Sequence, residues 1–356
     1  MAKTRGKTDI STTTSVILLI AVFLFFLATT GGKELNAISL QNILDASVIY
    51  IIAGLGLLFV AAQGSADLSI GVNLGLSTVI ATAIALKVHG DWVAIPLTIV
   101  FAACLGLLNG WLIGTMKVPS FMVTIAWLLG LRGFIVYFQT DIMPKFLPDM
   151  TAAYYQTAGP LLALKNNAVK YPIFIALIVV FYLLLQHTKF GSYCRAIGEN
   201  ELVAKNIGVP VRKIKLLAFM VSGLMAGIAG LFYLTRNGGT NNTVGQNLEV
   251  EVLVCIFAGC ILVTGGYGTN VPKLLIGCFT FSILSNGIGL MSATLTKTFP
   301  LIPPAFWKSV PRGIMLILIM YAVIRMREWE GKRSVKLTEE DEARTLNAAL
   351  DAASAK

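Results

Sequence analysis

The chain has 356 residues, of which 56% are hydrophobic and only 13% are charged, and its mean hydropathy is +0.77. Soluble domains carry about 25% charged residues, so this composition excludes a soluble globular protein and indicates an integral membrane protein. The net charge of +10 would suit a nucleic-acid-binding protein, but its placement on one set of loops indicates membrane orientation instead.

Ten apolar segments follow one another along the chain. A helix needs about 20 mostly apolar residues to span a bilayer. The candidate spans are roughly 13–30, 46–63, 69–88, 92–115, 119–139, 171–187, 214–235, 249–264, 271–292 and 309–327. The sequence therefore predicts an all-α polytopic membrane protein with about ten transmembrane helices.

The basic residues predict the orientation of these helices. Eighteen of the 28 lysines and arginines lie before residue 11, at Lys117 and Lys273, in the 188–215 loop, or from residue 325 onward. Such an excess on alternate loops marks the cytoplasmic side. We therefore expect both termini and the 188–215 loop in the cytoplasm, which agrees with an even number of spans, and the 140–170 loop outside.

The stretch Gly64–Gly71 separates the second apolar segment from the third. Asp67 can cap the next helix, and the glycines permit a tight or unwound turn. The residue chemistry favours a simple helix–helix connection, while the alternative is a broken helix that lines a translocation path. Gly265–Gly268 makes a second such break.

Polar residues within the apolar segments either join helices or mark a substrate path. The candidates for the path are Asp67, Ser69, Asn109, Ser285 and Asn286.

Arg132 and Arg312 also lie inside apolar segments. We expect them to have structural roles, with protein partners or a wet cavity, because an isolated charge in lipid is costly.

A sparse internal repeat involves the same positions. Asn109-Gly110 precedes Arg132-Gly133 by 23 residues, and Asn286-Gly287 precedes Arg312-Gly313 by 26 residues. The two copies run in opposite directions on the expected topology, which is the pattern of an inverted repeat in transporters. A match this sparse also arises by chance, so both explanations stay open.

The 188–215 loop contains a short helix with its own boundary residues. Asn200 is a suitable N-cap, and Glu201 can pair with Lys205 one turn later. Gly208 can end the helix in the left-handed conformation, and Pro210 prevents its continuation. A helix this short is marginal in isolation, so it is either part of a connecting loop or a docking element for a cytoplasmic partner.

Signs of catalysis are missing from the sequence. It has no Gly-x-x-x-x-Gly-Lys-Ser/Thr phosphate loop, and its two histidines have no acidic or cysteine companion at ligand spacing. Four of the five cysteines fall in apolar segments and Cys194 in the basic loop, so no disulfide framework is indicated. We expect no enzyme activity, no metal site and no cofactor bound by this chain.

The chain therefore divides into a single transmembrane domain, residues 1–327, and a C-terminal tail, residues 328–356. The tail carries the acidic run Glu339–Glu342 and an alanine-rich end. We expect it to be a solvated cytoplasmic appendage.

Several motifs resemble the ribose-type sugar permeases of bacterial ATP-binding-cassette importers, within the branched-chain-permease-like superfamily. They are Gly64–Gly71, Leu107–Gly110, Pro119–Thr124, Leu131–Gly133, Arg195–Asn200, Gly265–Gly268, Ser285–Gly287 and Lys308–Gly313, in that order, across residues 45 to 325. The sequence departs from the family pattern at two places, so these stretches do not identify the substrate. The second glycine of the pattern is missing from Gly64-Ser65-Ala66-Asp67, and Cys260 follows Ile256–Gly259.

The resemblance implies a permease that moves a monosaccharide or related polyol by alternating access across the bacterial cytoplasmic membrane. Its implied partners are a second permease subunit, identical or different, a substrate-binding protein, and a cytoplasmic ATPase that holds ATP and Mg²⁺. It also implies that the 200–208 helix couples to the ATPase. The coupling residues would be Glu199, Asn200, Glu201, Leu202, Ala204, Lys205 and Gly208.

The alternative from another class is an ion-coupled secondary transporter or channel that needs no ATPase. Such carriers place a carboxylate at mid-membrane, whereas Asp45, Asp67, Glu249 and Glu251 lie near the ends of the expected segments. This placement counts against proton coupling. The sequence does not identify the sugar.

Overall fold

The computed structural model describes residues 10–88, 91–146, 159–261, 265–299, 301–303, 305–322 and 324–325. The expected tail 328–356 and the middle of the 140–170 loop lie outside these residues. The described elements are α1 Ile10–Thr29, η1 Lys33–Leu35, α2 Ala37–Ala62, α3 Ile70–Val88, α4 Asp91–Thr115, α5 Ser120–Tyr137, η2 Phe138–Ile142, α6 Met143–Phe146, α7 Gly159–Ala163, α8 Asn167–His187, α9 Lys189–Glu199, α10 Glu201–Asn206, α11 Val211–Asn237, α12 Leu248–Ala258 and α13 Val271–Thr298.

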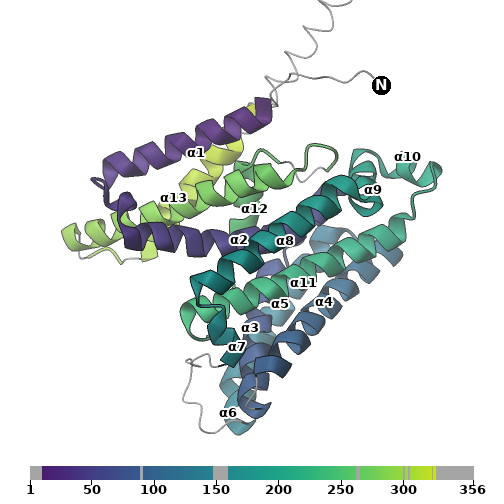
Figure 1. Ribbon diagram of the computed structural model, residues 1–356, viewed down its shortest axis with the longest axis horizontal. Coiled ribbons are helices and arrows are strands. Elements are labelled where there is room, and N and C mark those ends of the chain that lie inside the picture. Colours follow the sequence, from purple (N-terminus) through teal and green to yellow (C-terminus); the bar gives the residue numbers. More distant parts are fainter. Residues whose placement is uncertain are drawn as a thin grey trace, which may run out of the picture.

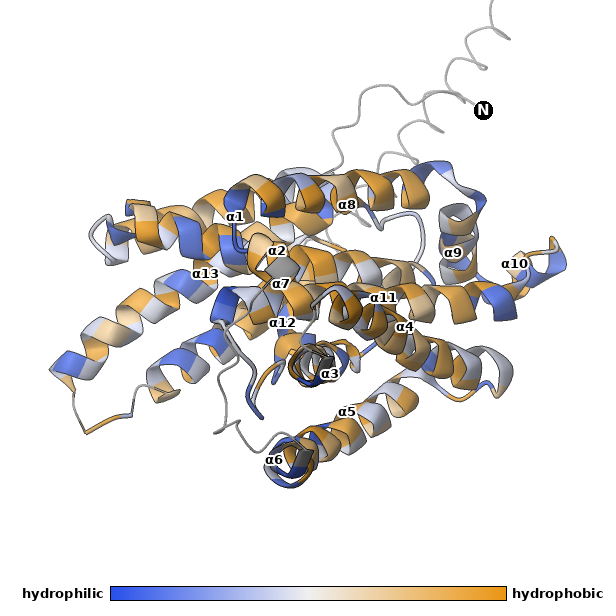
Figure 2. Cartoon of the chain, turned by 60° about the horizontal axis from the view of Figure 1, so that its bottom comes forward, coloured by the Kyte–Doolittle hydropathy of each residue, from blue (hydrophilic) through white to orange (hydrophobic). Residues whose placement is uncertain are grey.

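Nine helical stretches in this part of the chain are long and apolar enough to cross a membrane. They are α1, α2, α3, α4, α5 with its continuation to Lys145, α8, α11, α13 and the helix Ala305–Ala322. The prediction of an all-α polytopic membrane protein is confirmed. Figure 2 shows the apolar residues spread over these long helices, with hydrophilic residues at many of their ends.

The segment expected as a tenth span, residues 249–264, is different. It forms α12, which has only 11 residues and is about 16 Å long, roughly half the thickness of a bilayer core. The helix stops at Gly259 because Cys260 adopts a left-handed backbone conformation, with φ of 56°. The prediction of a full span here was wrong, because hydropathy continues past the point where the helix ends.

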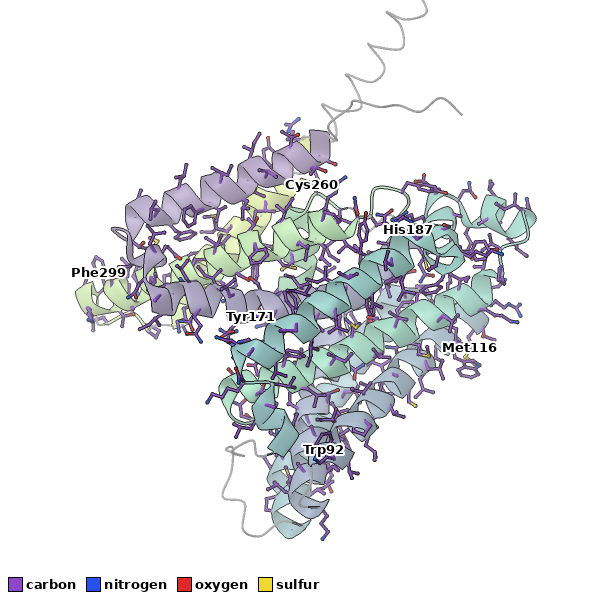
Figure 3. The ribbon with its side chains drawn as sticks, viewed as in Figure 1. Trp92, Met116, Tyr171, His187, Cys260 and Phe299 are labelled. Atoms are coloured by element: carbon purple, nitrogen blue, oxygen red, sulfur yellow. The ribbon has the colours of Figure 1, made fainter. Side chains whose placement is uncertain are left out.

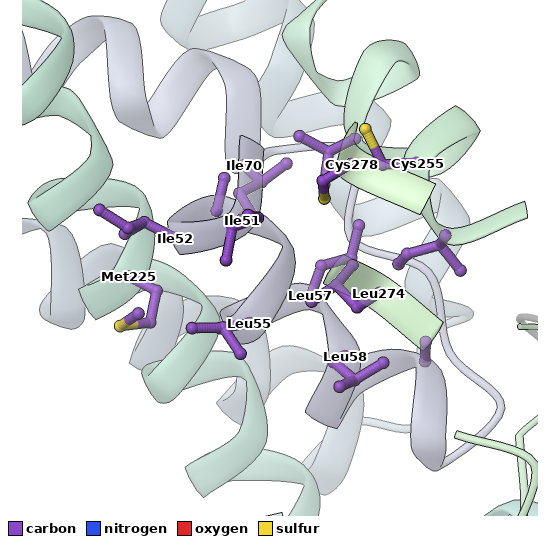
Figure 4. Close-up of a cluster of buried hydrophobic side chains, with 14 of the residues drawn as sticks. Ile51, Ile52, Leu55, Leu57, Leu58, Ile70, Met225, Cys255, Leu274 and Cys278 are labelled. Carbon is purple, nitrogen blue, oxygen red and sulfur yellow. The ribbon is translucent and has the colours of Figure 1, made fainter. Parts of the chain in front are cut away.

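Two helices, α2 and α11, form the centre of the molecule. Of the α2 span 78% is buried, against 6% for Ala305–Ala322 at the outside. Figure 4 shows the core around α2. Its buried side chains include Ile51, Ile52, Leu55, Leu57 and Leu58 from α2, Met225 from α11 and Leu274 from α13.

Small residues bring the central helices into close contact. Gly106 of α4 lies directly against Gly223 of α11, and a Cβ added to either would fall within 3.0 Å of the other's backbone. Close backbone approach at small residues is the usual way in which membrane helices associate. Here it locks α11 against α4.

The helices pack as an inverted repeat predicts, with the central helix of each half against a helix of the other half. The central helix α2 packs on α13, and its counterpart α11 packs on α4 (Figure 1). The first turn of α3 and the segment before α12 also meet, since a Cβ on Gly71 would lie 2.9 Å from the Gly245 carbonyl oxygen. This arrangement favours the repeat over a chance match.

Candidate translocation site and coupling helices

The break between α2 and α3 is held by a buried network. Oδ1 of Asp67 accepts hydrogen bonds from the Ser69 backbone N–H at 3.0 Å and from the Ser69 hydroxyl at 2.6 Å. Its Oδ2 accepts from Ser222 of α11 at 2.7 Å, and Asn109 of α4 donates to Ser69 at 2.8 Å. Each of these four residues is at most 3% exposed. The structure thus brings three of the candidate path residues together, in a network that fastens the unwound segment to its neighbours.

The two expected breaks touch each other. The Gly266 N–H donates to the Ala62 carbonyl at 2.9 Å. A Cβ on Gly265 would lie 2.6 Å from the Gly64 nitrogen and 2.7 Å from Cα of Gly198 in α9. Only glycines allow this approach, and Gly265 and Gly266 also have φ of 94° and 90°. Both non-helical segments therefore meet beneath α9.

Arg132 and Arg312 each have a protein partner, and both partners belong to the region of α12. The Arg132 guanidinium donates to the Val244 carbonyl at 2.8 Å and interacts electrostatically with Glu249. The Arg312 guanidinium forms an ion pair with Glu251 and donates to the Ser285 hydroxyl at 3.0 Å. Each arginine of the internal repeat therefore faces one of the two acidic residues in the first turn of α12.

Glu251 lies near the start of its segment, as expected, but this start is inside the bundle. Its Oε2 accepts from the Tyr50 hydroxyl at 2.8 Å, and Tyr50 is in the middle of α2. Ser285 and Arg312 are likewise central in α13 and in Ala305–Ala322. A carboxylate therefore lies at mid-span, because α12 is a half-length helix that begins inside the bundle.

A pocket of about 350 Å³ opens beside this ion pair, between facing stripes of α2 and α13. It is called here the α2–α13 slot and is lined by Asn42, Ala46, Tyr50, Arg236, Ser282, Ser285, Asn286, Gly289 and Leu290. Asn286 also donates to the buried Glu34 carboxylate at 2.9 Å. Of the path candidates, Ser285 and Asn286 line the slot, whereas Asp67, Ser69 and Asn109 do not.

Sequence reasoning missed most of the slot. Asn42, Ala46 and Tyr50 recur at the four-residue spacing of one helix face, but Asn42 precedes the segment that hydropathy marked. Which helix this face meets is a tertiary property, so the pairing with Ser282 of α13 was not visible.

The 188–215 loop folds into two short helices, α9 and α10, where the sequence indicated one. Asn200 caps α10 as expected, accepting from the N–H groups of Leu202 at 3.0 Å and Val203 at 3.1 Å. Gly208 has φ of 88°. Glu201 pairs with Lys215 of α11 at 2.7 Å instead of with Lys205, because α11 turns back beside α10.

The helix α10 projects from the bundle and presents apolar side chains. Leu202, Val203 and Ile207 are 73%, 55% and 71% exposed, while Ala204 is buried against the bundle. Figure 3 places His187, at the end of α8, at the same end of the molecule as this helix, and Trp92 at the far end. A short helix with three uncovered apolar residues is suited to docking on another protein.

Two connections tie this helix pair to the breaks. Glu199, the last residue of α9, accepts from the Tyr267 N–H at 2.9 Å, and Arg195 donates to the Thr269 carbonyl at 3.3 Å. Beside α10 lies a groove of about 1020 Å³ whose lining includes Ser65 from the first break and Lys205 from α10. The helix α9 is therefore in direct contact with both unwound segments.

Comparison with known proteins identifies the family. Residues 39–320 match the model of the family described as branched-chain amino acid transport system / permease component. The xylose transport system permease protein XylH of Escherichia coli (strain K12) is 27% identical, covering 86% of this chain and 90% of its own. The ribose import permease protein RbsC of the same strain is 25% identical, covering 85% and 90%, respectively.

A third relative is the autoinducer 2 import system permease protein LsrC of Photorhabdus luminescens, 25% identical over 88% of this chain and 90% of its own. No solved structure matches. The family match extends over most of the chain, from the start of α2 to the last described helix, and includes both breaks and the α9–α10 pair. The chain belongs to the family of branched-chain amino acid transport system permease components.

Proposed function

We propose that this chain is the membrane-spanning permease subunit of an ATP-binding-cassette importer that moves a monosaccharide or related polyol across the bacterial cytoplasmic membrane. The relatives named as xylose, ribose and autoinducer 2 permeases support this substrate class. The single structural observation that carries the proposal is the α10 helix, with three exposed apolar side chains and a connection through α9 to both unwound segments.

The partners follow from that role. A cytoplasmic ATPase, which holds ATP and Mg²⁺, receives α10 in a groove, while Glu199 and Lys205 lie at the rim. A substrate-binding protein delivers the sugar at the opposite end of the bundle. A second permease subunit, identical or different, completes the path, which agrees with the little-buried α5 and Ala305–Ala322 helices.

The mechanism is alternating access with the ATPase as the source of free energy. Closure of the ATPase moves α10, and α9 passes the movement to the contact between Gly64 and Gly265. The half-length helix α12 begins beside the first turn of α3, next to the first break, and is followed by the second break. It carries Glu249 and Glu251, so its position responds to the same movement. This chain itself is expected to catalyse no reaction.

The mid-span Glu251 is the observation that favours an ion-coupled transporter as the second candidate. Its ion pair with Arg312 reduces its ability to exchange protons, and the relatives are named as transport-system permeases. The importer is therefore the better-supported function.

Reconstitution in proteoliposomes tests the proposal. The chain is purified from its native membrane together with the ATPase that accompanies it, and the binding protein is added loaded with D-xylose, D-ribose or a non-sugar control. The expected result is sugar uptake that requires ATP and the binding protein. Uptake driven by a proton gradient without ATP would refute the importer and favour the ion-coupled transporter.

A further inference from the structure

The α2–α13 slot lies at a place that a solute can reach from outside the bundle. Asn42 begins its α2 face and Arg236 ends α11, and both lie at the end of the bundle opposite α9 and α10, because Ala62 of α2 contacts α9. The lining residues of α2 from Asn42 to Tyr50 cover about 12 Å along the helix. The slot thus leads from the expected external side toward mid-span.

At mid-span the slot ends at two lining residues that are bound to the ion pair. Tyr50 and Ser285 belong to the lining, and both are bound to the Glu251–Arg312 pair. The ion pair thus fixes the two hydroxyls at the inner end of the slot. The slot therefore ends at mid-span in this conformation, as expected of an outward-open binding pocket.

Ser282 is a buried polar residue in the lining. Ser282 is 1% exposed, and its hydroxyl makes no hydrogen bond within the described part of the chain. A buried hydroxyl without a hydrogen bond destabilises the protein. A ligand that forms a hydrogen bond with Ser282 removes this penalty, which favours its binding. Small residues leave the room for one: a Cβ on Gly289 would meet nothing within 4 Å.

The lining suits a polyhydroxylated solute. Amides of Asn42 and Asn286 and hydroxyls of Ser282 and Ser285 both donate and accept hydrogen bonds, as sugar hydroxyls do. The carboxylates beside the slot, Glu34 and Glu251, each accept a hydrogen bond from a lining residue, Asn286 and Tyr50 respectively, and the charged residue in the lining itself is Arg236 at its outer end. The volume of about 350 Å³ lies within the range of small-ligand pockets.

We propose that the α2–α13 slot is a monosaccharide-binding subsite within the membrane domain, in which Asn42, Ser282 and Asn286 contact sugar hydroxyls, while Tyr50 and Ser285, held by the Glu251–Arg312 pair, form the inner end. This inference rests on the proposed import function and adds the place where specificity is exerted.

The first test measures uptake and ATP hydrolysis in the reconstituted complex. Gly289→Leu fills the slot and should lower D-xylose or D-ribose uptake at least tenfold, while stimulation of ATP hydrolysis by loaded binding protein persists. Ser282→Ala removes one hydrogen bond and should lower uptake about two- to tenfold. Ala176→Leu, on an exposed face of α8, adds a similar side chain away from the slot and should leave uptake unchanged. Wild-type uptake in Gly289→Leu would overturn the subsite.

The second test needs no ATPase. Ala46→Cys is made in a Cys104→Ser background, which leaves the four buried native cysteines, and is treated with a hydrophilic thiol reagent. Saturating D-xylose or D-ribose should slow labelling at least threefold, whereas glycine betaine should not. Leu202→Cys on α10 should react at the same rate with and without sugar. Equal labelling of Ala46→Cys in all conditions refutes the subsite, whereas failure of wild-type uptake alone refutes the import function.

Discussion

At the scale of single residues, the backbone conformation of Gly208 has the clearest consequence. Its φ of 88° lies in the left-handed region, and a Cβ there would meet nothing within 4 Å. Any effect of a substitution therefore comes from backbone strain and not from a steric clash. The strain acts where α10 ends and the chain turns back into α11.

Gly208→Val should lower sugar transport and the stimulated rate of ATP hydrolysis, because a β-branched residue disfavours positive φ by about 1–2 kcal/mol and displaces α10. Ala204→Asp should do the same by forcing a charge into a position that is 1% exposed. Both rates are measured in the reconstituted complex.

Gly208→Asn is the matched control, because asparagine tolerates the left-handed region; it should retain most of the activity. Membrane insertion should be normal in all three variants. Unchanged stimulation in Gly208→Val and Ala204→Asp would mean that α10 is only a connector.

The Glu251–Arg312 pair supports a second residue-scale prediction. Arg312→Gln leaves Glu251 at mid-span with Tyr50 as its remaining partner, which should lower stability by about 2–3 kcal/mol, at the lower end for a broken buried pair because Arg312 is partly exposed. Thermal unfolding in detergent, followed by size-exclusion chromatography, measures the loss.

The double variant Glu251→Gln/Arg312→Gln should recover part of that loss, since it no longer contains an unpaired charge. A double variant that is less stable than both single variants would contradict the assignment of these residues as a pair.

Local sequence rules correctly predicted features that depend only on neighbouring residues in the chain. The cap at Asn200 and the left-handed Gly208 depend only on neighbouring residues, and both are as expected. The partner of Glu201 was predicted wrongly, because the competing Lys215 is brought in by the tertiary path of α11.

At the scale of elements, α9 is the connection between the cytoplasmic side and the bundle. It contributes Gly198 to the contact between the breaks and Glu199 to the Tyr267 backbone. Hydropathy located every long span, although α2 begins nine residues before the expected start at residue 46, but it did not show α9 as a helix of its own. Nor did it show that α12 stops at Ala258, because apolar residues continue while the backbone turns at Cys260.

Glu199→Ala should weaken the connection between α9 and the second break. We expect a lower stimulation of ATP hydrolysis by loaded binding protein, with the basal hydrolysis rate and expression unchanged. Glu199→Gln keeps the oxygen that accepts from Tyr267 and should retain most of the stimulation. Equal effects of the two substitutions would point to the charge of Glu199, and not its hydrogen bond, as the important property.

At the scale of the whole molecule, the orientation of the bundle is a prediction from the basic loops. Lys205→Cys should react with a membrane-impermeant thiol reagent in inverted vesicles and not in intact cells. Burial raises the pKa of the Cys194 thiol to about 12, so this neighbouring cysteine stays protonated and unreactive at neutral pH. Labelling of Lys205→Cys in intact cells would reverse the topology.

The pairing of distant helices could not be predicted from the sequence. Composition and periodicity are properties of single helices, and they gave the class of fold. The α2–α13 slot depends on two helices separated by more than 200 residues, and no local pattern of Asn42, Tyr50 or Ser282 specifies that pairing.

The short α12 helix has a consequence for biosynthesis. Its 11 residues carry two carboxylates in the first turn. The free energy of inserting one charged residue at the centre of a membrane helix is unfavourable by about 2.5–3.5 kcal/mol. The segment is therefore unsuited to spanning lipid by itself, and its carboxylates need protein partners. Arg312, the counter-ion of Glu251, emerges 61 residues later. The ion pair of Glu251 with Arg312 can therefore form only after the helix Ala305–Ala322 has been synthesised.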